Sequence, residues 1–241
     1  YFDRTAFLTQ SGQLYAEASA MAHRRVYTFG PTFRAEKSKT RRHLTEFWML
    51  EPEVAFCDLA GIMSLAEDLV ARVVQEVLER RREELKILER DLSKLERIQT
   101  PFPRMTYTQA AEILAKHPES TFKAGDDFGA PDETIISNLH DRPVMVTHYP
   151  AEVKAFYMKR TEEPAPKALC FDMLGSEGVG EIIGGSQRED DLDRLLHRIR
   201  EHDLPQQYFE WYLDRRRYGS VPHAGFGLGL ERTVGWIAGI E

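Results

Sequence analysis

Apolar residues recur at helical spacing through residues 58–98, where they are interspersed with glutamate and arginine. Positions three or four apart share one face of a helix, so this spacing predicts one or two amphipathic helices with a solvated charged face. We assign the segment a structural role. The residues that define the pattern are Leu65, Leu69, Val73, Val77, Leu85, Leu88, Leu92 and Leu95.

Shorter runs rich in β-branched and aromatic residues lie on both sides of this segment and predict strands. Their spacing favours hairpins over alternating strand–helix–strand units, which predicts an α+β fold, an antiparallel β-sheet flanked by helices. Polar stretches at 125–133 and 161–167 predict surface loops. The predicted strands are 26–29, 47–50, 144–147 and 168–171.

Composition sets limits on the class of protein. The 241 residues, 42% of them hydrophobic, suffice for a sizeable core, and the net charge of −7 means that a polyanion must be met by a local basic patch. The two cysteines, Cys57 and Cys170, lack the spacing of a zinc site or a disulfide framework, so we expect a reducing cytoplasm. No apolar run reaches the ~20 residues that cross a bilayer, so we expect no membrane association.

The first stretch with candidate chemistry is a basic run between two predicted strands. Six cationic or potentially cationic side chains lie between positions 34 and 43. In a hairpin loop such side chains would wrap a polyphosphate, although a solvated loop has the same composition. The six are Arg34, Lys37, Lys39, Arg41, Arg42 and His43.

The second stretch places two carboxylates, Asp172 and Glu181, in apolar strand-like sequence. A lone carboxylate is costly there unless it is paired, hydrogen-bonded or bound to a metal, and its hard oxygens suit Mg²⁺ carried in by ATP. Gly184 and Gly185 would let a ligand approach the backbone, and Arg188 offers a planar fork for a carboxylate or amide oxygen. A glycine bulge and a buried ion pair are the structural alternatives.

The third stretch has glycine at every second position, at Gly225, Gly227 and Gly229. This alternation would free one face of a strand, so that a flat ring or a substrate lies directly on the sheet, although close backbone packing gives the same pattern. Arg232 follows at the start of a predicted helix, whose N-terminus also attracts phosphate. No strand is followed by the glycine-rich turn of a dinucleotide fold or a P-loop.

These stretches, in this order, resemble the second and third signature motifs of class II aminoacyl-tRNA synthetases. The motifs are Phe-Arg-x-Glu at 33–36, Arg-His-Leu-x-Glu-Phe at 42–47 and Gly-x-Gly-x-Gly-x-Glu-Arg at 225–232. The acidic Gly-Gly-Ser segment between them is found in the aspartyl, asparaginyl and lysyl subgroup. The joint match is highly specific and covers nearly the whole chain, residues 58–98 alone being generic.

The resemblance implies a ligase that uses ATP and Mg²⁺ and has no nucleophile or general base. Arg34 and Arg232 would be the catalytic residues, holding the α-phosphate and the γ-phosphate of ATP. Phe47 would stack on the adenine. Asp172 and Glu181 would bind Mg²⁺, so the protein would act by positioning its substrates and neutralising their charge.

Four further residues would contact ATP by the same resemblance. Glu36 would touch the adenine or the incoming terminal adenosine of tRNA, and Arg42 and His43 would lie near the outer phosphates. Gly229 would lie beneath the nucleotide.

Within the subgroup, the amino-acid site resembles that of the asparaginyl enzymes. Ala16 stands where aspartyl enzymes have a lysine. Glu51 would accept a hydrogen bond from the amide nitrogen of asparagine, Arg188 would donate to the amide oxygen, and Ser11 and Gln13 would hold the α-amino group. The structural alternative for Glu51 is a partner for a lysine or arginine of the hairpin.

The resemblance as a whole implies activation of asparagine and its transfer to tRNA(Asn) by a cytoplasmic homodimer. Residues 1–241 would be the class II catalytic domain, with the first motif and an N-terminal OB-fold anticodon-binding domain lying outside this chain. The alternatives are a tRNA-independent asparagine synthetase-like enzyme and an aspartyl-tRNA synthetase. A non-enzymatic nucleotide or RNA binding module is disfavoured, because both motif arginines and both acids are present.

Overall fold

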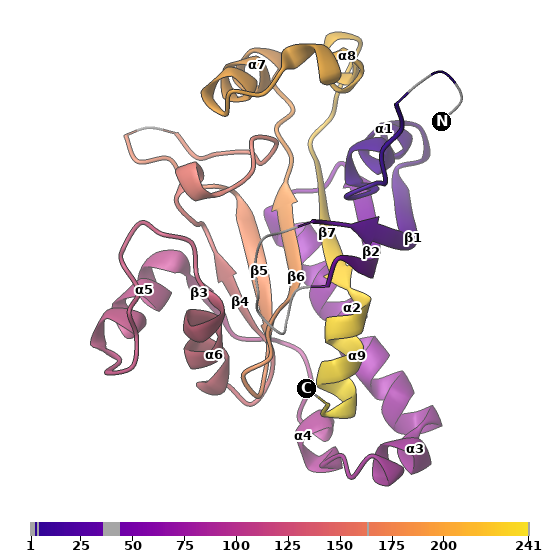
Figure 1. Ribbon diagram of the computed structural model, residues 1–241, viewed down its shortest axis with the longest axis vertical. Helices are drawn as coiled ribbons and strands as arrows, with labels where there is room; N and C mark the ends of the chain where they lie inside the picture. Colours follow the sequence, from indigo (N-terminus) through magenta and orange to yellow (C-terminus); the bar gives the residue numbers. More distant parts are fainter. Residues whose placement is uncertain (1–2, 4, 36–43, 163, 241) are drawn as a thin grey trace.

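The computed structural model describes residue 3 and residues 5–35, 44–162 and 164–240. Within them, seven strands form one sheet in the order β1-β2-β7-β6-β5-β4-β3, with helices packed around it (Figure 1). Neighbouring strands are antiparallel except for the parallel pair β3–β4, which confirms the α+β class. The strands are β1 (Arg25–Phe33), β2 (Glu46–Ala55), β3 (Arg104–Thr106), β4 (Val144–Thr147), β5 (Cys170–Gly175), β6 (Gly180–Gln187) and β7 (His223–Gly229). The helices are α1 (Gln13–His23), α2 (Leu59–Arg80), α3 (Arg82–Ile87), α4 (Leu92–Glu96), α5 (Tyr107–Lys116), α6 (Ala130–Asn138), α7 (Leu192–Glu201), α8 (Glu210–Arg217) and α9 (Leu230–Ala238), with the 3-10 helices η1 (Ala151–Val153) and η2 (Gln206–Tyr208).

The predicted strands correspond closely to the observed ones. Residues 26–29 and 47–50 lie inside β1 and β2, and residues 144–147 coincide with β4. The fourth predicted strand, 168–171, corresponds to β5, which begins two residues later at Cys170. Ala168 lies outside the strand because it makes only an isolated bridge with Arg160.

The helical segment consists of three helices rather than the one or two that its periodicity predicts. After α3, Glu89 has a φ of 57°, which a right-handed helix cannot contain, and Asp91 caps α4 by accepting a hydrogen bond from the backbone N–H of Ser93 at 3.0 Å. These breaks are set by backbone conformation, which hydrophobic spacing does not encode.

The buried face of α2 is also rotated from the predicted one. Leu65 is 41% exposed, whereas the stripe against the sheet includes the small side chain of Ala66. Alanine gives no strong hydrophobic signal, so the sequence pattern favoured the larger leucines beside it. The stripe is Leu59, Ile62, Met63, Ala66, Val70, Val74 and Leu78.

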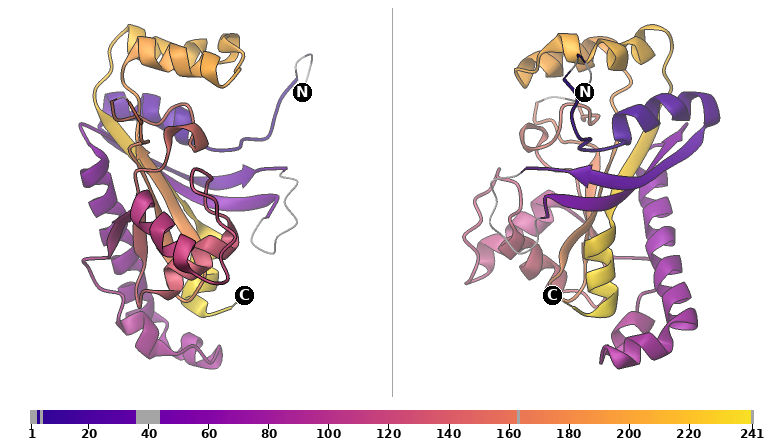
Figure 2. Two further views of the ribbon diagram at one scale, coloured as in Figure 1. Left: turned by 90° about the vertical axis from the view of Figure 1, so that its left-hand side faces the viewer. Right: turned by 45° about the vertical axis from the view of Figure 1, so that its right-hand side comes forward.

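Helix α2 covers one face of the sheet, and the β1–β2 hairpin extends to the other side (Figure 2). Strand alternation sorts the side chains of β2 between these sides. Leu50 and Val54 pack in the core beneath α2, while Met49, Glu51 and Glu53 point to the opposite side. Helices α5 and α6 pack on β4 and β5 and form with them a second hydrophobic core. Helices α7 and α8 pack together at one end of the molecule (Figure 1). The candidate functional site therefore lies on the face of the sheet opposite α2.

The predicted loop at 125–133 is shorter than expected, because α6 begins at Ala130. Pro131 lies in its first turn, where the fixed φ of proline suits a helix, and Asp132 accepts a hydrogen bond from the N–H of Gly129 at 3.0 Å. Residues 161–162 and 164–167 contain no helix or strand, as predicted. None of the helices in the described ranges is long and apolar enough to span a bilayer.

Candidate active site

A cavity of about 1010 Å³ opens beside β2, β7 and the start of α9. Its lining includes Arg34, Phe47, Glu181, Gly229 and Arg232, which come from four separate parts of the sequence. The structure thus brings four predicted ATP-binding residues and Glu181, a predicted magnesium ligand, to one cavity. The other three, Glu36, Arg42 and His43, lie outside the described residues.

Arg34 enters this cavity from the loop end of the β1–β2 hairpin, directly after β1. Its backbone N–H donates to the carbonyl of Thr45 at 2.9 Å, so the strand pairing continues to this residue. The Nε atom donates to the carbonyl of Gln10 at 3.3 Å, and the guanidinium lies 5.2 Å from the centre of the Phe47 ring. No carboxylate pairs with Arg34 in the described part of the chain, so its charge faces the cavity.

Asp172 and Glu181 converge over one glycine of the sheet. Asp172 on β5 pairs with Gly184 on β6. A methyl group added to Gly184 would lie 2.7 Å from Oε1 of Glu181 and 3.6 Å from Oδ1 of Asp172. Burial, together with the charges of Asp172 and Glu133, raises the pKa of Glu181 to about 8.

Magnesium fits this pair of carboxylates. Within the described ranges no group of three or more potential protein ligands gathers as a metal site. Mg²⁺ usually takes one or two protein carboxylates and completes its shell with water and substrate phosphates. Glu181 lines the cavity and Asp172 lies next to Glu181, so the two carboxylates match that ligand set.

A buried lysine accompanies these acids. Nζ of Lys154 lies 2.9 Å from Oδ2 of Asp172, 3.1 Å from Oδ1 of Asp127 and 3.9 Å from the centre of the Tyr149 ring. Burial by itself would lower the pKa of Lys154, but the two aspartates raise it above its usual value. Lys154 is therefore a charged group of this part of the site, to which the sequence interpretation assigned no role.

The glycines of the third stretch serve a different purpose from the one predicted. Methyl groups at Gly225 and Gly227 would lie 2.1 Å from Oε1 of Glu53 and 2.3 Å from Cε of Met49, so neighbouring side chains already fill that face. At Gly229 nothing lies within 4 Å, and there alone among the three the sheet is open to a ligand.

The same correction applies at Gly184 and Gly185. The space above Gly184 is taken by Glu181, and a methyl group at Gly185 would lie 2.4 Å from the ring of Phe171. These glycines accommodate protein side chains rather than a ligand.

Glu51 holds the amino-terminal segment against the sheet. Its side chain is 4% exposed and accepts hydrogen bonds from the N–H of Gly12 at 2.8 Å, from Thr28 Oγ1 at 3.0 Å and from Ser11 Oγ. Glu51 and Ser11 are thus brought together as predicted residues of the amino-acid site. Within the described residues, the partners of Glu51 are hydroxyl and amide groups, not the lysine or arginine of the structural alternative.

Arg188 is paired with Glu53, a residue that the sequence interpretation did not name. Its Nε donates to Oε2 of Glu53 at 3.3 Å and its Nη1 to Ser186 Oγ at 2.6 Å, and Arg188 is only 2% exposed. Burial opposes the charge, but the Glu53 carboxylate raises the pKa of Arg188. Strand alternation would have identified Glu53, because it lies two positions after Glu51 on the same face.

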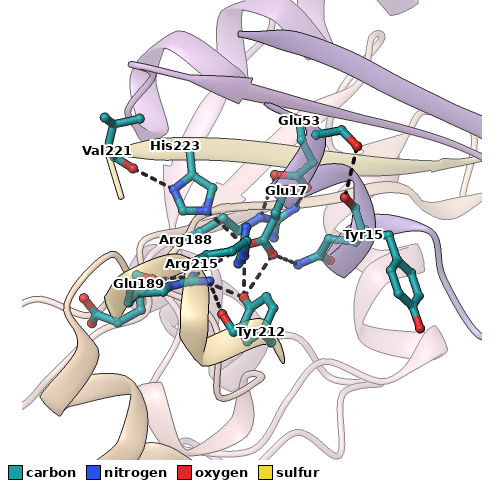
Figure 3. A network of polar contacts seen from close by, with 12 residues as sticks. Tyr15, Glu17, Glu53, Arg188, Glu189, Tyr212, Arg215, Val221 and His223 are labelled. Atoms are coloured by element: carbon teal, nitrogen blue, oxygen red, sulfur yellow. Dashed lines mark hydrogen bonds and ion pairs between the residues drawn. The ribbon is translucent and has the colours of Figure 1, made fainter. Parts of the chain in front are cut away.

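Next to this pair lies a fully buried carboxylate, Glu17 of α1, with partners from α8 and β7 (Figure 3). It lies 2.9 Å from Nε2 of His223 and accepts hydrogen bonds from Arg215 at 2.6 Å and Tyr212 Oη at 3.0 Å. Burial alone would raise the pKa of Glu17, but His223 and the nearby arginines lower it. Gln13, predicted to hold the α-amino group, donates to Glu17 at 3.2 Å.

Comparison with known proteins agrees with this geometry. The family model of tRNA synthetases class II (D, K and N) matches residues 1–241. An asparagine–tRNA ligase of Koribacter versatilis (strain Ellin345) is 60% identical over 246 residues, covering 100% of this chain and 56% of that protein. A second one, from Sorangium cellulosum (strain So ce56), is 59% identical and is likewise covered to 56%. The chain therefore spans about half the length of these curated relatives.

Solved structures give the same relationship. The asparaginyl-tRNA synthetase of Pyrococcus horikoshii, complexed with asparaginyl-adenylate, superposes with a TM-score of 0.95 at 51% identity over 99% of this chain and 55% of that chain. An aspartyl-tRNA synthetase from Entamoeba histolytica reaches a TM-score of 0.86 at 31% identity over 98% of this chain and 50% of that chain. Since the family model matches the chain from end to end, this protein belongs to the class II tRNA synthetases of the D, K and N group.

Proposed function

We propose that this protein activates asparagine with ATP and transfers it to tRNA(Asn). The observation that carries the proposal is the cavity in which Arg34, Phe47, Glu181 and Arg232 meet. A cation near each end of a triphosphate, an aromatic ring and an acid suited to Mg²⁺ form the set that ATP requires. The asparaginyl relatives supply the identity of the amino acid.

In the proposed reaction, the carboxylate of asparagine attacks the α-phosphorus of ATP. A carboxyl oxygen–phosphorus bond forms, the bond between the α-phosphorus and its bridging oxygen breaks, and pyrophosphate leaves with its charge. Two anions must meet, so the protein's task is to position them and to neutralise charge. Arg34 would hold the α-phosphate and Arg232 the γ-phosphate, while Phe47 stacks on adenine.

Asp172 and Glu181 would hold the magnesium that arrives with ATP, which supplies positive charge to the phosphates. The described part of the site offers no activated nucleophile, and none is required because the substrate carboxylate is itself the nucleophile. In the second step the asparaginyl group passes to the tRNA and AMP is released.

Selection of asparagine would rest on the acids around the amino-acid site. Glu51 and Glu53 are both buried, and the Arg188 guanidinium is already bound by Glu53. The buried Ala16 stands at the position where aspartyl enzymes have a lysine. An aspartate side chain would therefore bring a like charge close to carboxylates, whereas a neutral amide would not. We also propose a homodimer in the cytoplasm, with residues 1–241 as the catalytic domain.

The decisive experiment is amino-acid-dependent exchange of pyrophosphate into ATP, with asparagine and aspartate side by side, followed by charging of purified tRNA. We expect exchange with asparagine and charging of tRNA(Asn). Exchange with aspartate and charging of tRNA would identify an aspartyl enzyme instead. Exchange with aspartate, formation of free asparagine when ammonia is supplied, and no charging of tRNA would identify the tRNA-independent alternative.

A further inference from the structure

Lys154 occupies a position that the proposed mechanism does not use. It follows η1 and reaches across to β5, and its side chain is only 12% exposed. Its ammonium contacts Asp172 and Asp127 and lies over the face of Tyr149. An exposed lysine would lose side-chain entropy for such an arrangement with little gain, whereas a buried cation needs these partners.

The two oxygens of Asp172 have different surroundings. Oδ2 accepts from Lys154 at 2.9 Å, whereas Oδ1 lies on the side of Gly184, where Oε1 of Glu181 also lies. The lysine thus neutralises Asp172 through Oδ2, while Oδ1 lies on the side shared with Glu181. It also repels any further cation that approaches this carboxylate.

We propose that Lys154 is a positioning residue that makes magnesium binding depend on ATP, an inference that rests on the proposed nucleotide site. By occupying Oδ2, Lys154 fixes Asp172 with Oδ1 toward Glu181. Its charge keeps this acid pair from binding a divalent cation alone. The triphosphate supplies the additional negative charge, and the cation then binds with the nucleotide.

The sign of the effect follows from Coulomb's law. Removing one positive charge in contact with a ligand carboxylate strengthens the attraction of a divalent cation, even at the effective dielectric constant of about 20 that applies near protein surfaces. We expect Lys154→Met to bind Mn²⁺ without nucleotide about tenfold or more tightly than the wild-type protein. Lys154→Arg keeps the charge and should behave like wild type.

The test is a titration of the full chain with Mn²⁺, in which electron paramagnetic resonance measures the free ion. It is run without nucleotide and with a non-hydrolysable ATP analogue. The ratio of the two Mn²⁺ affinities is the coupling between metal and nucleotide, and we expect it to be large in wild type and to fall about tenfold in Lys154→Met. A lysine with only a structural role would change the melting temperature but not this ratio.

Lys167→Met is the matched control. Nζ of Lys167 lies 6.0 Å from the centre of the Tyr107 ring, which belongs to the same buried cluster as Tyr149, and in the described part of the chain Lys167 does not contact Asp172. It should bind Mn²⁺ as the wild type does. Equal Mn²⁺ affinity of wild type and Lys154→Met without nucleotide would overturn the proposal, as would tight Mn²⁺ binding by wild type alone. The titration requires neither amino acid nor tRNA, so loss of asparagine-dependent exchange would refute the proposed function while leaving this result to stand.

Discussion

Arg188 on the chain following β6 and Glu53 on β2 form an ion pair with almost no exposure to solvent, 3% and 0% for the two side chains. Glu51, two residues away, binds Ser11, Gly12 and Thr28 instead. Glu53 therefore neutralises the charge of Arg188, and Glu51 holds the segment that precedes α1 in place.

The first prediction concerns this pair. Glu53→Gln leaves the Arg188 guanidinium buried without its countercharge, which typically costs about 3–5 kcal/mol of unfolding free energy. Urea denaturation measures the loss. Glu46→Gln, at the exposed start of the same strand, should change stability by less than about 0.5 kcal/mol. Equal losses in the two variants would contradict the buried role of Glu53.

The second prediction concerns Arg34. Arg34→Ala removes a cation that the proposed mechanism places on the α-phosphate, and loss of one such donor costs ~2.7–4 kcal/mol of barrier, a 10²–10³-fold fall in rate. Pyrophosphate exchange with asparagine measures it. The fold should survive, because Arg34 has no ion-pair partner in the described residues. Arg25→Ala, at the exposed other end of β1, is the control, and undiminished exchange in Arg34→Ala would refute the assignment.

The third prediction concerns the acid stability that Glu17 confers. Its pKa is lowered from an ordinary value of about 4.5, so the folded state binds its proton less readily than the unfolded state. The contribution of the Glu17 charge to the free energy of unfolding is therefore complete above about pH 4.5. It is lost as the pH falls through the lower pKa that Glu17 has in the folded state. Glu17→Gln should be less stable than wild type at pH 7, and the difference should shrink below pH 4.5.

Thermal unfolding across this pH range tests the Glu17 prediction. Glu210→Gln is the matched control, because Glu210 is an acid at the start of α8 whose ion pair with Arg217 is exposed. Its unfolding curve should follow wild type at neutral pH. A constant difference between Glu17→Gln and wild type from pH 7 to acid would show that the carboxylate charge is not what stabilises the cluster.

The fourth prediction separates two glycines that the sequence treated alike. Gly185→Ala would push a methyl group to 2.4 Å from the ring of Phe171, which is fully buried and cannot yield, so we expect a loss of about 1–3 kcal/mol. Gly229→Ala meets nothing within 4 Å, so its unfolding free energy should stay near wild type. Because Gly229 lines the cavity, the KM for ATP should rise instead. The opposite order of stabilities would show that the packing assigned to Gly185 is wrong.

Several features could be derived from the sequence because each depends on neighbours along the chain. The strand of Val144–Thr147 shows in its β-branched and apolar composition, and the hairpin shows in two such runs around a basic loop. The signature residues Arg34, Phe47, Glu181 and Arg232 stand in motifs with fixed local spacing. All four residues line one cavity, while their roles in binding ATP and magnesium stay predictions.

Other features were decided only when distant segments packed together. Lys154 meets Asp172, and Glu17 meets His223 across 206 positions, through contacts that no local pattern encodes. The purpose of the glycines also depends on tertiary structure, since Gly225 is occupied from the neighbouring strand by Glu53 while Gly229 is open. Sequence by itself determined which chemical groups this protein carries and the class of reaction they suit. Only the folded structure decided which charges neutralise one another, because burial and pairing of charges depend on distances in space rather than along the chain.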